Sequence, residues 1–364
     1  MKPYMPDILP LKKLDWMKFI HLIGPANSEL ARYDGIIHGI VNPNVLVSPL
    51  TTKEAVLSSR IEGTQATLVE VLEFEASQKT NIKTEREKDI QEIINYRRSI
   101  MFATEWINVK PVTLNMIKKV HFTLLDSVRG RNKGRGEFRS VQNWIGKPGM
   151  PMAQAEYIPP EPMKLIEYLS NFEKYIHFKE KDFLVQLAVI HAQFEIIHPF
   201  IDGNGRVGRI LIPLFLFEKK LLSSPIFYIS EYLESHRDEY CNRLREITQE
   251  NKWEEWVKFF LKAIYEQAKL NSNKAKLIIK LYNQKKERIQ SITHSQYLIK
   301  ILDSLFTRPI FSTTYFIKES GIPKRSALRF LNIMEKEGII SVLRPGKGRK
   351  ATIFMFRKLI NIIG

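Results

Sequence analysis

The sequence predicts a mainly α protein, and three features of its pattern support this fold class. Residues 85–105 and 113–126 carry apolar side chains at the three- and four-residue spacing of amphipathic helices. Residues 182–197 are apolar on nearly every face, which is typical of a helix buried at the centre of a domain. Strand-like alternation is limited to a short stretch at 138–145 and to the C-terminal end of the chain. We therefore expect a helical core with a small β-hairpin, followed by a separate C-terminal domain.

The N-terminal helices are expected to be divided by a glycine. Residues 51–76 open with two threonines suited to capping, Thr51 and Thr52, and continue with apolar residues at helical spacing. Gly63 interrupts that spacing, so this segment is expected to form two helices. Thr113 is expected to cap the helix that follows it.

The middle of the chain is expected to hold a long loop, followed by two apolar helices with a break between them. Residues 129–160 are rich in Gly and Pro and are expected to form a long loop with the small hairpin. A connection of that length in a compact domain is usually either functional or disordered. The buried helix is broken at 198–205 by the sequence HPFIDGNG, after which a second apolar helix resumes. A further helical element is expected at 236–248.

The positive charge of the chain is concentrated near its C-terminal end. Residues 268–364 hold 20 Lys and Arg against 5 Asp and Glu, a net charge of +15, out of +17 for the whole chain. Such a segment favours a polyanionic partner, although a solvated basic surface explains the charge equally well. Helical patterns at 296–306, 312–319 and 324–337 are followed by two β-like runs around a basic glycine-rich turn at 346–350. This order predicts a winged helix-turn-helix domain.

Composition excludes several classes of protein. Hydrophobic residues make up 44% of the 364 residues and charged residues 26%, which excludes a wholly disordered chain. The single cysteine, Cys241, excludes a disulfide framework and a multi-cysteine zinc site. The first residues have no signal-peptide core, and no apolar run approaches the 18 to 20 residues of a membrane span. We expect a cytoplasmic protein that does not bind membranes.

The segment from His198 to Arg209, HPFIDGNGRVGR, carries the chemistry. Gly203 and Gly205 lead into a helix N-terminus, where backbone N–H groups favour a phosphate. Arg206 and Arg209 follow in the first turns of that helix, where guanidinium groups can bind phosphate oxygens. The pattern therefore indicates a nucleotide-phosphate site.

Two further side chains complete the predicted nucleotide-phosphate site. Asp202 is a hard oxygen ligand suited to Mg²⁺ that bridges phosphates. His198 lies at the start of the same loop and is suited to act as a general base. The alternative is a structural turn, since a lone DGNG sequence is more often a turn than a site. A turn does not, however, require two arginines at the start of an apolar helix.

The segment resembles the signature of the Fic (filamentation induced by cAMP) family, HPFxDGNGRxxR, at every specified position. The similarity continues into Gly136–Arg139, Trp144–Gly146 and Pro159–Pro160, which look like the family's flap hairpin, and it covers roughly residues 30–265. The resemblance implies a Fic helical core with a β-hairpin flap, carrying a protein adenylyltransferase. In such an enzyme His198 deprotonates a hydroxyl of a target protein, AMP is transferred from ATP, and pyrophosphate leaves.

The resemblance also assigns the remaining site residues. Asp202 would hold Mg²⁺, and glycine at 205, where a kinase-like branch carries lysine, favours transfer of AMP over transfer of phosphate. The nucleotide-binding residues implied are Glu62, Gly203, Asn204, Gly205, Arg206, Val207, Gly208, Arg209 and Tyr240. The flap residues implied are Asn143, Trp144, Ile145 and Gly146.

An N-terminal segment matches the inhibitory pattern of the same family, [ST]xxxE[GN]. Ser58, Glu62 and Gly63 occupy its specified positions. By resemblance, this segment is the inhibitory helix of the family's second class, in which Glu62 pairs with Arg209 and displaces the γ-phosphate. Without the resemblance, the segment is an ordinary helix end.

These inferences give a domain division and a set of competing functions. We expect an N-terminal helical region with the inhibitory helix at 1–110, the catalytic core at 111–270, and a helical connector with the winged helix at 271–364. The expected partner is a protein with a Ser, Thr or Tyr acceptor, with DNA at the basic domain and a homodimer as further options. One alternative is a DNA-binding winged-helix regulator with a Fic sensor domain, and another is an enzyme that removes AMP.

Overall fold

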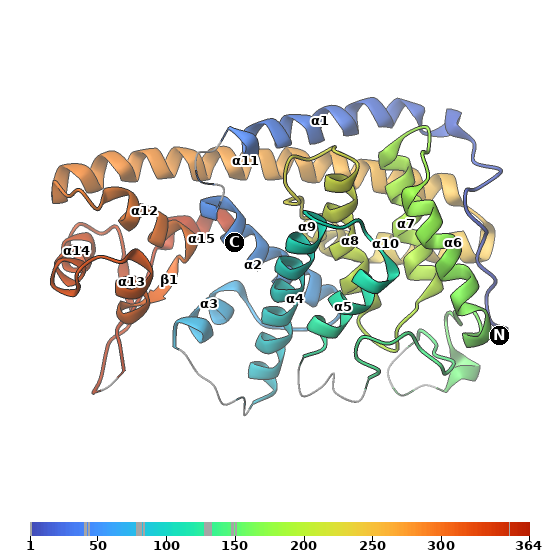
Figure 1. Cartoon of the computed structure of the whole chain (residues 1–364), viewed down its shortest axis with the longest axis horizontal. Coiled ribbons are helices and arrows are strands. Elements are labelled where there is room, and N and C mark those ends of the chain that lie inside the picture. The colour runs from blue at the N-terminus through green and yellow to red at the C-terminus, as the bar shows by residue number, and fades with distance from the viewer. Residues whose placement is uncertain are drawn as a thin grey trace. The chain divides into compact units, whose positions relative to one another are not determined.

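The computed structural model describes residues 2–39, 42, 44–77, 82, 84–126, 133–146, 149, 151–348 and 350–364. The described chain is mainly helical, as predicted, with one small antiparallel sheet (Figure 1). None of the described helices combines the length and the apolar character that crossing a bilayer requires. Arg349 of the predicted wing and residues 129–132, 147, 148 and 150 of the predicted loop lie outside the described residues.

The helices and strands follow one another in a fixed order along the chain. The helices are α1 (Ile20–His38), α2 (Asn44–Ile61), α3 (Leu68–Ala76), α4 (Glu85–Ile107), α5 (Leu114–Leu124), α6 (Leu165–His177), α7 (Phe183–Ile197), α8 (Asn204–Glu218), α9 (Ser230–Ser235), α10 (Arg237–Glu250), α11 (Trp253–Thr293), α12 (Leu298–Thr307), α13 (Thr313–Ser320), α14 (Lys324–Lys336) and α15 (Arg357–Ile363). The strands are β1 (Ile310–Ser312), β2 (Ser341–Arg344) and β3 (Ile353–Met355).

Two compact units are assembled from these elements. The first unit comprises Met1–Asp34, Leu57–Thr64 and Asn95–Lys269, and the second comprises Gly35–Val56, Gln65–Ile94 and Leu270–Gly364. Each unit draws on segments that are distant in the sequence, so compactness divides the chain differently from the three sequence domains. That three-domain division stays a prediction.

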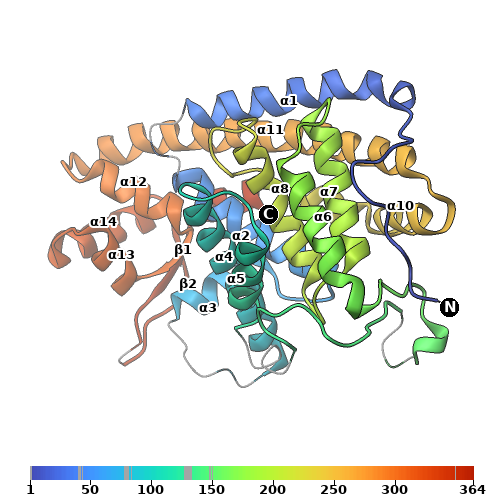
Figure 2. The same ribbon diagram turned by 45° about the vertical axis from the view of Figure 1, so that its right-hand side comes forward.

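The core of the first unit is built around α7. Asp182 caps this helix by accepting hydrogen bonds from the N–H groups of Leu184 and Val185 at 2.9 and 3.0 Å. Helices α6 and α8 pack directly against α7 (Figures 1 and 2). From α11, the indole of the fully buried Trp256 donates to the carbonyl of Ala188 at 2.8 Å. The uniform apolarity of 182–197 is therefore explained by neighbours on every side, as predicted for a central helix.

The structure confirms the break at Gly63 and corrects the caps expected near it. Gly63 has φ +103°, a left-handed conformation that favours glycine, and it follows directly after the end of α2. Thr51 and Thr52, predicted as caps, lie inside α2 because that helix begins earlier, at Asn44. The next helix is capped by Thr67, while Thr113 caps α5 as predicted, accepting from Met116 N–H at 3.2 Å.

The predicted flap hairpin is present in outline. Its arms pair at one antiparallel bridge between Ile145 and Tyr157, where Ile145 N–H donates to Tyr157 O at 2.8 Å. The alternation at 138–145 does not produce a regular strand in the described part of the flap; Arg139 and Asn143 there donate to the carbonyls of His198 and Phe200 in the adjoining loop.

The C-terminal residues form helices α12 to α15 and one three-stranded sheet, and their assignment to a winged helix-turn-helix stays a prediction. Strand order is β1–β3–β2, and both pairings are antiparallel. The prediction missed β1, since three residues are too few to show alternation. One apolar cluster joins this sheet to α3 of the same unit; its buried members are Leu72, Ala76, Ile310, Ile353, Met355 and Ile360.

Candidate active site

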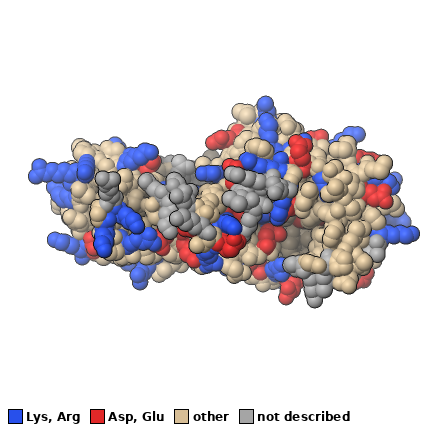
Figure 3. Space-filling view, turned by 90° about the horizontal axis from the view of Figure 1, so that it is seen from below, with Lys and Arg blue, Asp and Glu red and all other residues tan. Residues whose placement is uncertain are grey.

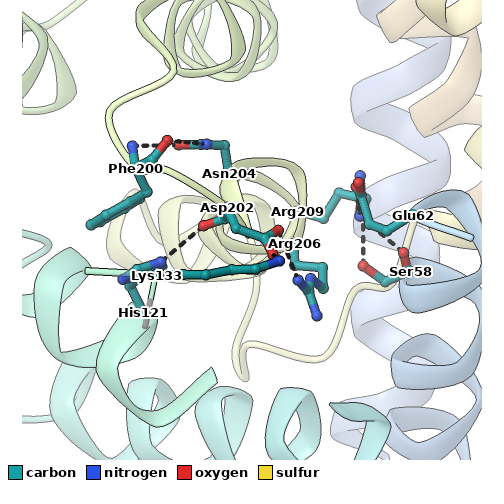
Figure 4. Close-up of polar contacts among 9 residues, drawn as sticks. All are labelled: Ser58, Glu62, His121, Lys133, Phe200, Asp202, Asn204, Arg206 and Arg209. Carbon is teal, nitrogen blue, oxygen red and sulfur yellow. Dashed lines mark hydrogen bonds and ion pairs between the residues drawn. The ribbon is translucent and has the colours of Figure 1, made fainter. Parts of the chain in front are cut away.

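The loop between α7 and α8 is closed by its own hydrogen bonds (Figure 4). His198 ends α7 in the left-handed conformation, with φ 49°, and Gly203 begins α8 with φ 81°. The side chain of Asn204 accepts from Phe200 N–H and donates to Phe200 O, both at 2.8 Å. This side chain, predicted to bind nucleotide, therefore forms hydrogen bonds that close the loop.

The N-terminus of α8 presents backbone donors to the space beside this loop. The first N–H groups of a helix have no partner within it and carry its partial positive charge. A Cβ at Gly205 would lie 2.4 Å from Oε1 of Glu62 and 2.9 Å from Arg209, so no larger residue fits there in this arrangement. At Gly208 a Cβ would lie 2.4 Å from Oε1 of Glu195, because α7 and α8 approach closely at this point. At both glycines a Cβ would displace a carboxylate that sequence alone did not place there.

His198 is held as a neutral imidazole whose Nε2 is unprotonated. Its Nδ1 lies 3.2 Å from the carbonyl oxygen of Glu195. A carbonyl only accepts, so Nδ1 carries the hydrogen and Nε2 keeps its lone pair. Burial lowers the pKa of His198 to about 4, so the neutral form dominates at pH 7. The predicted base is thus in the protonation state that a base requires.

Arg139 holds the turn at His198 in place. Its Nε donates to the carbonyl of His198 at 3.0 Å, and its main-chain N–H donates to the carbonyl of Pro199 at 2.9 Å. The side chain is buried, and burial lowers its pKa to about 10. The sequence showed Arg139 only as part of the flap similarity, and its role as a clamp on the loop was missed.

His121, from α5, supports the loop from the opposite side. Its Nδ1 accepts from Gly136 N–H and its Nε2 donates to the carbonyl of Asp202, both at 2.9 Å. Its ring stacks on Phe200 with centroids 3.7 Å apart. Burial lowers the pKa of His121 to about 4, which preserves the neutral ring that these two bonds need. No signal in the sequence distinguished this histidine from a core residue.

The carboxylate of Asp202 is engaged by two cations. Lys133 Nζ forms an ion pair with Oδ2, and Arg206 lies 3.3 Å from Oδ1. Burial opposes the charged form, but Arg206 and Lys133 outweigh it and hold the pKa of Asp202 below its usual range. The described residues contain no cluster of three or more His, Cys, Asp or Glu side chains that could enclose a metal. A single carboxylate that already attracts a cation still suits Mg²⁺, which commonly takes one or two carboxylates together with substrate phosphates.

Arg209 is fixed by the segment predicted to be inhibitory. Its guanidinium donates to Oγ of Ser58 at 2.7 Å, to the carbonyl of Ser58 at 2.9 Å and to Oε1 of Glu62 at 2.7 Å. The side chain of Arg209 is 1% exposed and that of Glu62 is 38% exposed. Burial works against the charge of Glu62, yet Arg209 lowers its pKa, so the pair is ionised at neutral pH. The structure thus brings Arg209 together with Ser58 and Glu62, from which it is about 150 residues distant in the sequence.

The remaining motif and flap residues are divided between core and surface. Val207 is fully buried, so it packs α8 instead of facing a ligand. Asn143 donates from its side chain to the carbonyl of Phe200 at 3.0 Å, which ties the flap to the loop. Trp144 and Ile145 are 43% and 40% exposed and leave an apolar edge on the flap.

A pocket of about 680 Å³ opens beside the flap. It is lined by Ile145 and Gly146 of the flap, Glu195 of α7, and a face of α10 that includes Cys241 and Asn242. Burial raises the pKa of Glu195 to about 8, so this carboxyl is mostly protonated at neutral pH. Sequence reasoning missed Glu195, whose position on an apolar helix gave no indication of a pocket.

Tyr240, predicted to contact the nucleotide, lies behind this pocket face. It is buried, and its hydroxyl lies 2.9 Å from Nε2 of His191. Helical periodicity places Arg237, Cys241 and Arg245 on the pocket side of α10 and Tyr240 on the core side. Tyr240 therefore does not line the pocket, and His191 is a buried partner of Tyr240.

Known proteins share both the sequence and the fold of this chain. The N-terminal model of the Fic/DOC family matches residues 20–105, and the Fic/DOC family model matches residues 111–216, which include the entire His198–Arg209 segment. The chain belongs to the Fic/DOC family. The match confirms the resemblance that the motif indicated.

Curated relatives of this Fic protein are described as adenylyltransferases. A probable protein adenylyltransferase of Aquifex aeolicus is 34% identical over 108 residues, which are 29% of this chain and 31% of the relative. The protein adenylyltransferase Fic of Drosophila grimshawi is 32% identical over 111 residues, which are 29% of this chain and 20% of the relative. The matched part thus spans less than a third of these relatives.

A solved structure extends the similarity of the fold to nearly the whole chain. A Fic family protein from Desulfovibrio desulfuricans G20 covers 98% of each chain with a TM-score of 0.58 and 18% identity. The mainly helical Fic fold, including the C-terminal elements, is therefore shared.

The protonation state of His198 gives a direct test of this site. We expect its ring resonance not to titrate between pH 5.5 and 8, because its pKa is lowered to about 4, whereas an exposed imidazole titrates near pH 6.5. Histidine Cε1–Hε1 NMR spectra, with His198→Gln to assign the signal, measure this. A midpoint near 6.5 for His198 would contradict the described burial.

Proposed function

We propose that this Fic protein transfers AMP from ATP to a hydroxyl group of a target protein. The observation that carries the proposal is the neutral His198, held with Nε2 unprotonated on the loop that leads into the N-terminus of α8. Family membership and the names of the relatives support the same reaction class. Fold alone does not imply chemistry, so the argument is based on the side chains of this site.

The proposed reaction assigns a separate task to each group. The target hydroxyl gives its proton to Nε2 of His198 as its oxygen attacks the α-phosphorus. The new P–O bond forms, the bond to the β-phosphate bridging oxygen breaks, and pyrophosphate leaves. Phosphates near His198 would raise its pKa from about 4 toward neutrality, because negative charge favours the imidazolium. A base whose pKa approaches the working pH is the more effective one.

The phosphates would be held by the N-terminus of α8 and by arginine. Backbone N–H groups at Gly205 and Arg206 are donors for anionic oxygens. Bound Mg²⁺ would neutralise phosphate charge, with Asp202 as its protein ligand. The pocket between the flap and α10 has the volume and the mixture of apolar and polar lining expected of a site for the base and ribose.

The target protein would dock on the flap. Trp144 and Ile145 form an exposed apolar edge, and Asn143 links that edge to the catalytic loop. Exposed apolar side chains beside a reactive group are typical of a protein-binding surface. An extended target segment that adds to the flap edge would present its hydroxyl to His198.

We further infer that Glu62 restrains the enzyme. The guanidinium of Arg209 has donors directed at Glu62 and Ser58, and these donors cannot at the same time be fully directed at a γ-phosphate. The Glu62 carboxylate also places negative charge where the phosphate charge would lie. The same carboxylate could instead orient water for removal of AMP, and this alternative is tested by the same variants.

His198 supplies the first test of the proposed function. We expect His198→Ala to lower AMP transfer by about 10²–10⁴-fold, because a positioned general base contributes about that much. ATP binding should remain close to that of the wild type, since the phosphates contact other groups. Labelled ATP with Mg²⁺ and mass spectrometry of the modified chain measure transfer, and undiminished transfer would refute the assignment.

Glu62 supplies the second test. Glu62→Gly should increase self-modification by about tenfold if the inhibited state is favoured by about 1.4 kcal/mol. Glu62→Gln should act in the same direction but less strongly, because an amide oxygen still accepts from Arg209.

Two controls make this test specific. Glu234→Gln removes a charge that pairs with Arg60 at 3.7 Å and should change nothing. Arg209→Ala should not reproduce the gain, since it also removes a phosphate ligand. Equal AMP incorporation by Glu62→Gly and wild type across a range of ATP concentrations would exclude inhibition.

A second candidate function is binding of DNA by the C-terminal domain. Lys324, Arg325 and Arg329 are exposed on α14, the second helix of the helix-turn-helix. Lys and Arg side chains gather over the C-terminal part of the surface in Figure 3. Phosphate contacts would position such a helix on a duplex, and the absence of Asn or Gln on α14 before Asn332 favours binding with little sequence preference.

The salt dependence of DNA binding tests this second candidate. We expect the affinity of the full chain for a duplex to fall by orders of magnitude between about 50 and 200 mM salt, because each phosphate contact releases counterions. Replacement of Lys324, Arg325 and Arg329 by alanine should abolish a gel shift at low salt. A matched triple replacement of the exposed Lys2, Lys12 and Lys13 should not. No shift with wild type at low salt would exclude the candidate.

A further inference from the structure

Lys133 occupies the position on Asp202 where a metal ion would be expected. Its ammonium forms an ion pair with Oδ2, while Arg206 pairs with Oδ1 (Figure 4). Asp202 is the one acidic residue of the loop between His198 and Gly203. A lysine ammonium and a divalent cation both seek the same carboxylate oxygen, and their like charges repel.

The two cations on Asp202 differ in how firmly they are held. Arg206 lies on the first turn of α8, four residues after Asp202, and its side chain is 5% exposed. Lys133 lies on a loop, and its side chain is 44% exposed. An exposed lysine on a flexible four-carbon stem can leave its partner at low cost, whereas a buried arginine cannot. Of the two, Lys133 is therefore the cation that a metal would displace.

The surroundings of Asp202 favour a substitute cation when no metal is bound. Asp202 is partly buried, with 32% of its side chain exposed, so a close cation partner offsets the cost of holding its charge there. His121 fixes the main chain of the same residue through its carbonyl. With Lys133 present, Oδ2 of Asp202 has a cationic partner while no metal is bound.

We propose that Lys133 is an internal competitor for the metal site, a positioning residue that holds Asp202 until a divalent cation displaces it. This inference builds on the proposed function, because it assigns Asp202 to the metal. Lys133 lowers the affinity of the nucleotide-free protein for the metal, so that the metal enters together with the nucleotide phosphates.

Binding of Mn²⁺ to the nucleotide-free protein tests the proposal without any measurement of activity. Mn²⁺ replaces Mg²⁺ at oxygen sites and is observed directly by electron paramagnetic resonance of the free ion. We expect Lys133→Met to bind Mn²⁺ about fivefold more tightly than wild type, the change that corresponds to an exposed ion pair of about 1 kcal/mol. Lys133→Gln should behave in the same way, which guards against an effect of methionine on folding.

Two controls separate displacement from a general change in charge. Lys118→Met removes a lysine that pairs with Glu137 at 2.7 Å and does not touch Asp202, so it should leave Mn²⁺ affinity unchanged. Asp202→Asn combined with Lys133→Met should remove the gain.

The outcomes decide the proposal independently of AMP transfer. Equal or weaker Mn²⁺ binding by Lys133→Met would overturn it, and so would an equal gain for Lys118→Met or no binding by any variant. A gain specific to Lys133 in a protein that transfers no AMP would leave the inference standing and refute the proposed function instead.

Discussion

The left-handed backbone at His198 is the constraint on which the site depends. Helix α7 is buried along its length, and the chain must leave it and enter α8 within a few residues. A non-glycine residue in this conformation costs on the order of 1 kcal/mol, so other contacts must hold it. Arg139 holds the carbonyls of His198 and Pro199, and Asn204 closes the loop on Phe200. The orientation of the imidazole follows from that fixed backbone.

Much of the signature motif therefore serves to shape the loop. Asn204 bonds only to Phe200 through its side chain in the described contacts, and Val207 packs in the core. Gly205 and Gly208 allow close approach of Glu62 and Glu195. The groups left to act on a ligand are few: the imidazole, one carboxylate, two arginines and the N–H groups of a helix end.

Electrostatics controls the protonation state of each of these groups. Burial keeps His198 and His121 neutral, with pKa values of about 4, while cations keep Asp202 and Glu62 ionised despite burial. Glu195, which has no dedicated cation, is instead raised to a pKa of about 8. Carboxyl groups within one site thus differ in charge because only some of them have a close guanidinium or ammonium partner.

The sequence by itself determined the helical class, the central buried helix, the break at Gly63 and the two C-terminal helices α13 and α14. Each of these depends on local pattern: periodicity, capping residues, or a glycine that relieves a left-handed turn. The catalytic motif was equally readable, because its residues lie within one loop and the first turns of one helix.

Only the tertiary structure decided which side chains from distant segments complete the site. The loop is supported by Lys133, His121 and Arg139. In the sequence, these residues stand at polar or apolar positions that do not indicate a contact with the loop. Tyr240 turned out to face the core, since the side of a helix that meets a pocket depends on packing and not on residue type. The start of α2 at Asn44, and strand β1, were also beyond prediction, because neighbours in the fold override weak local signals.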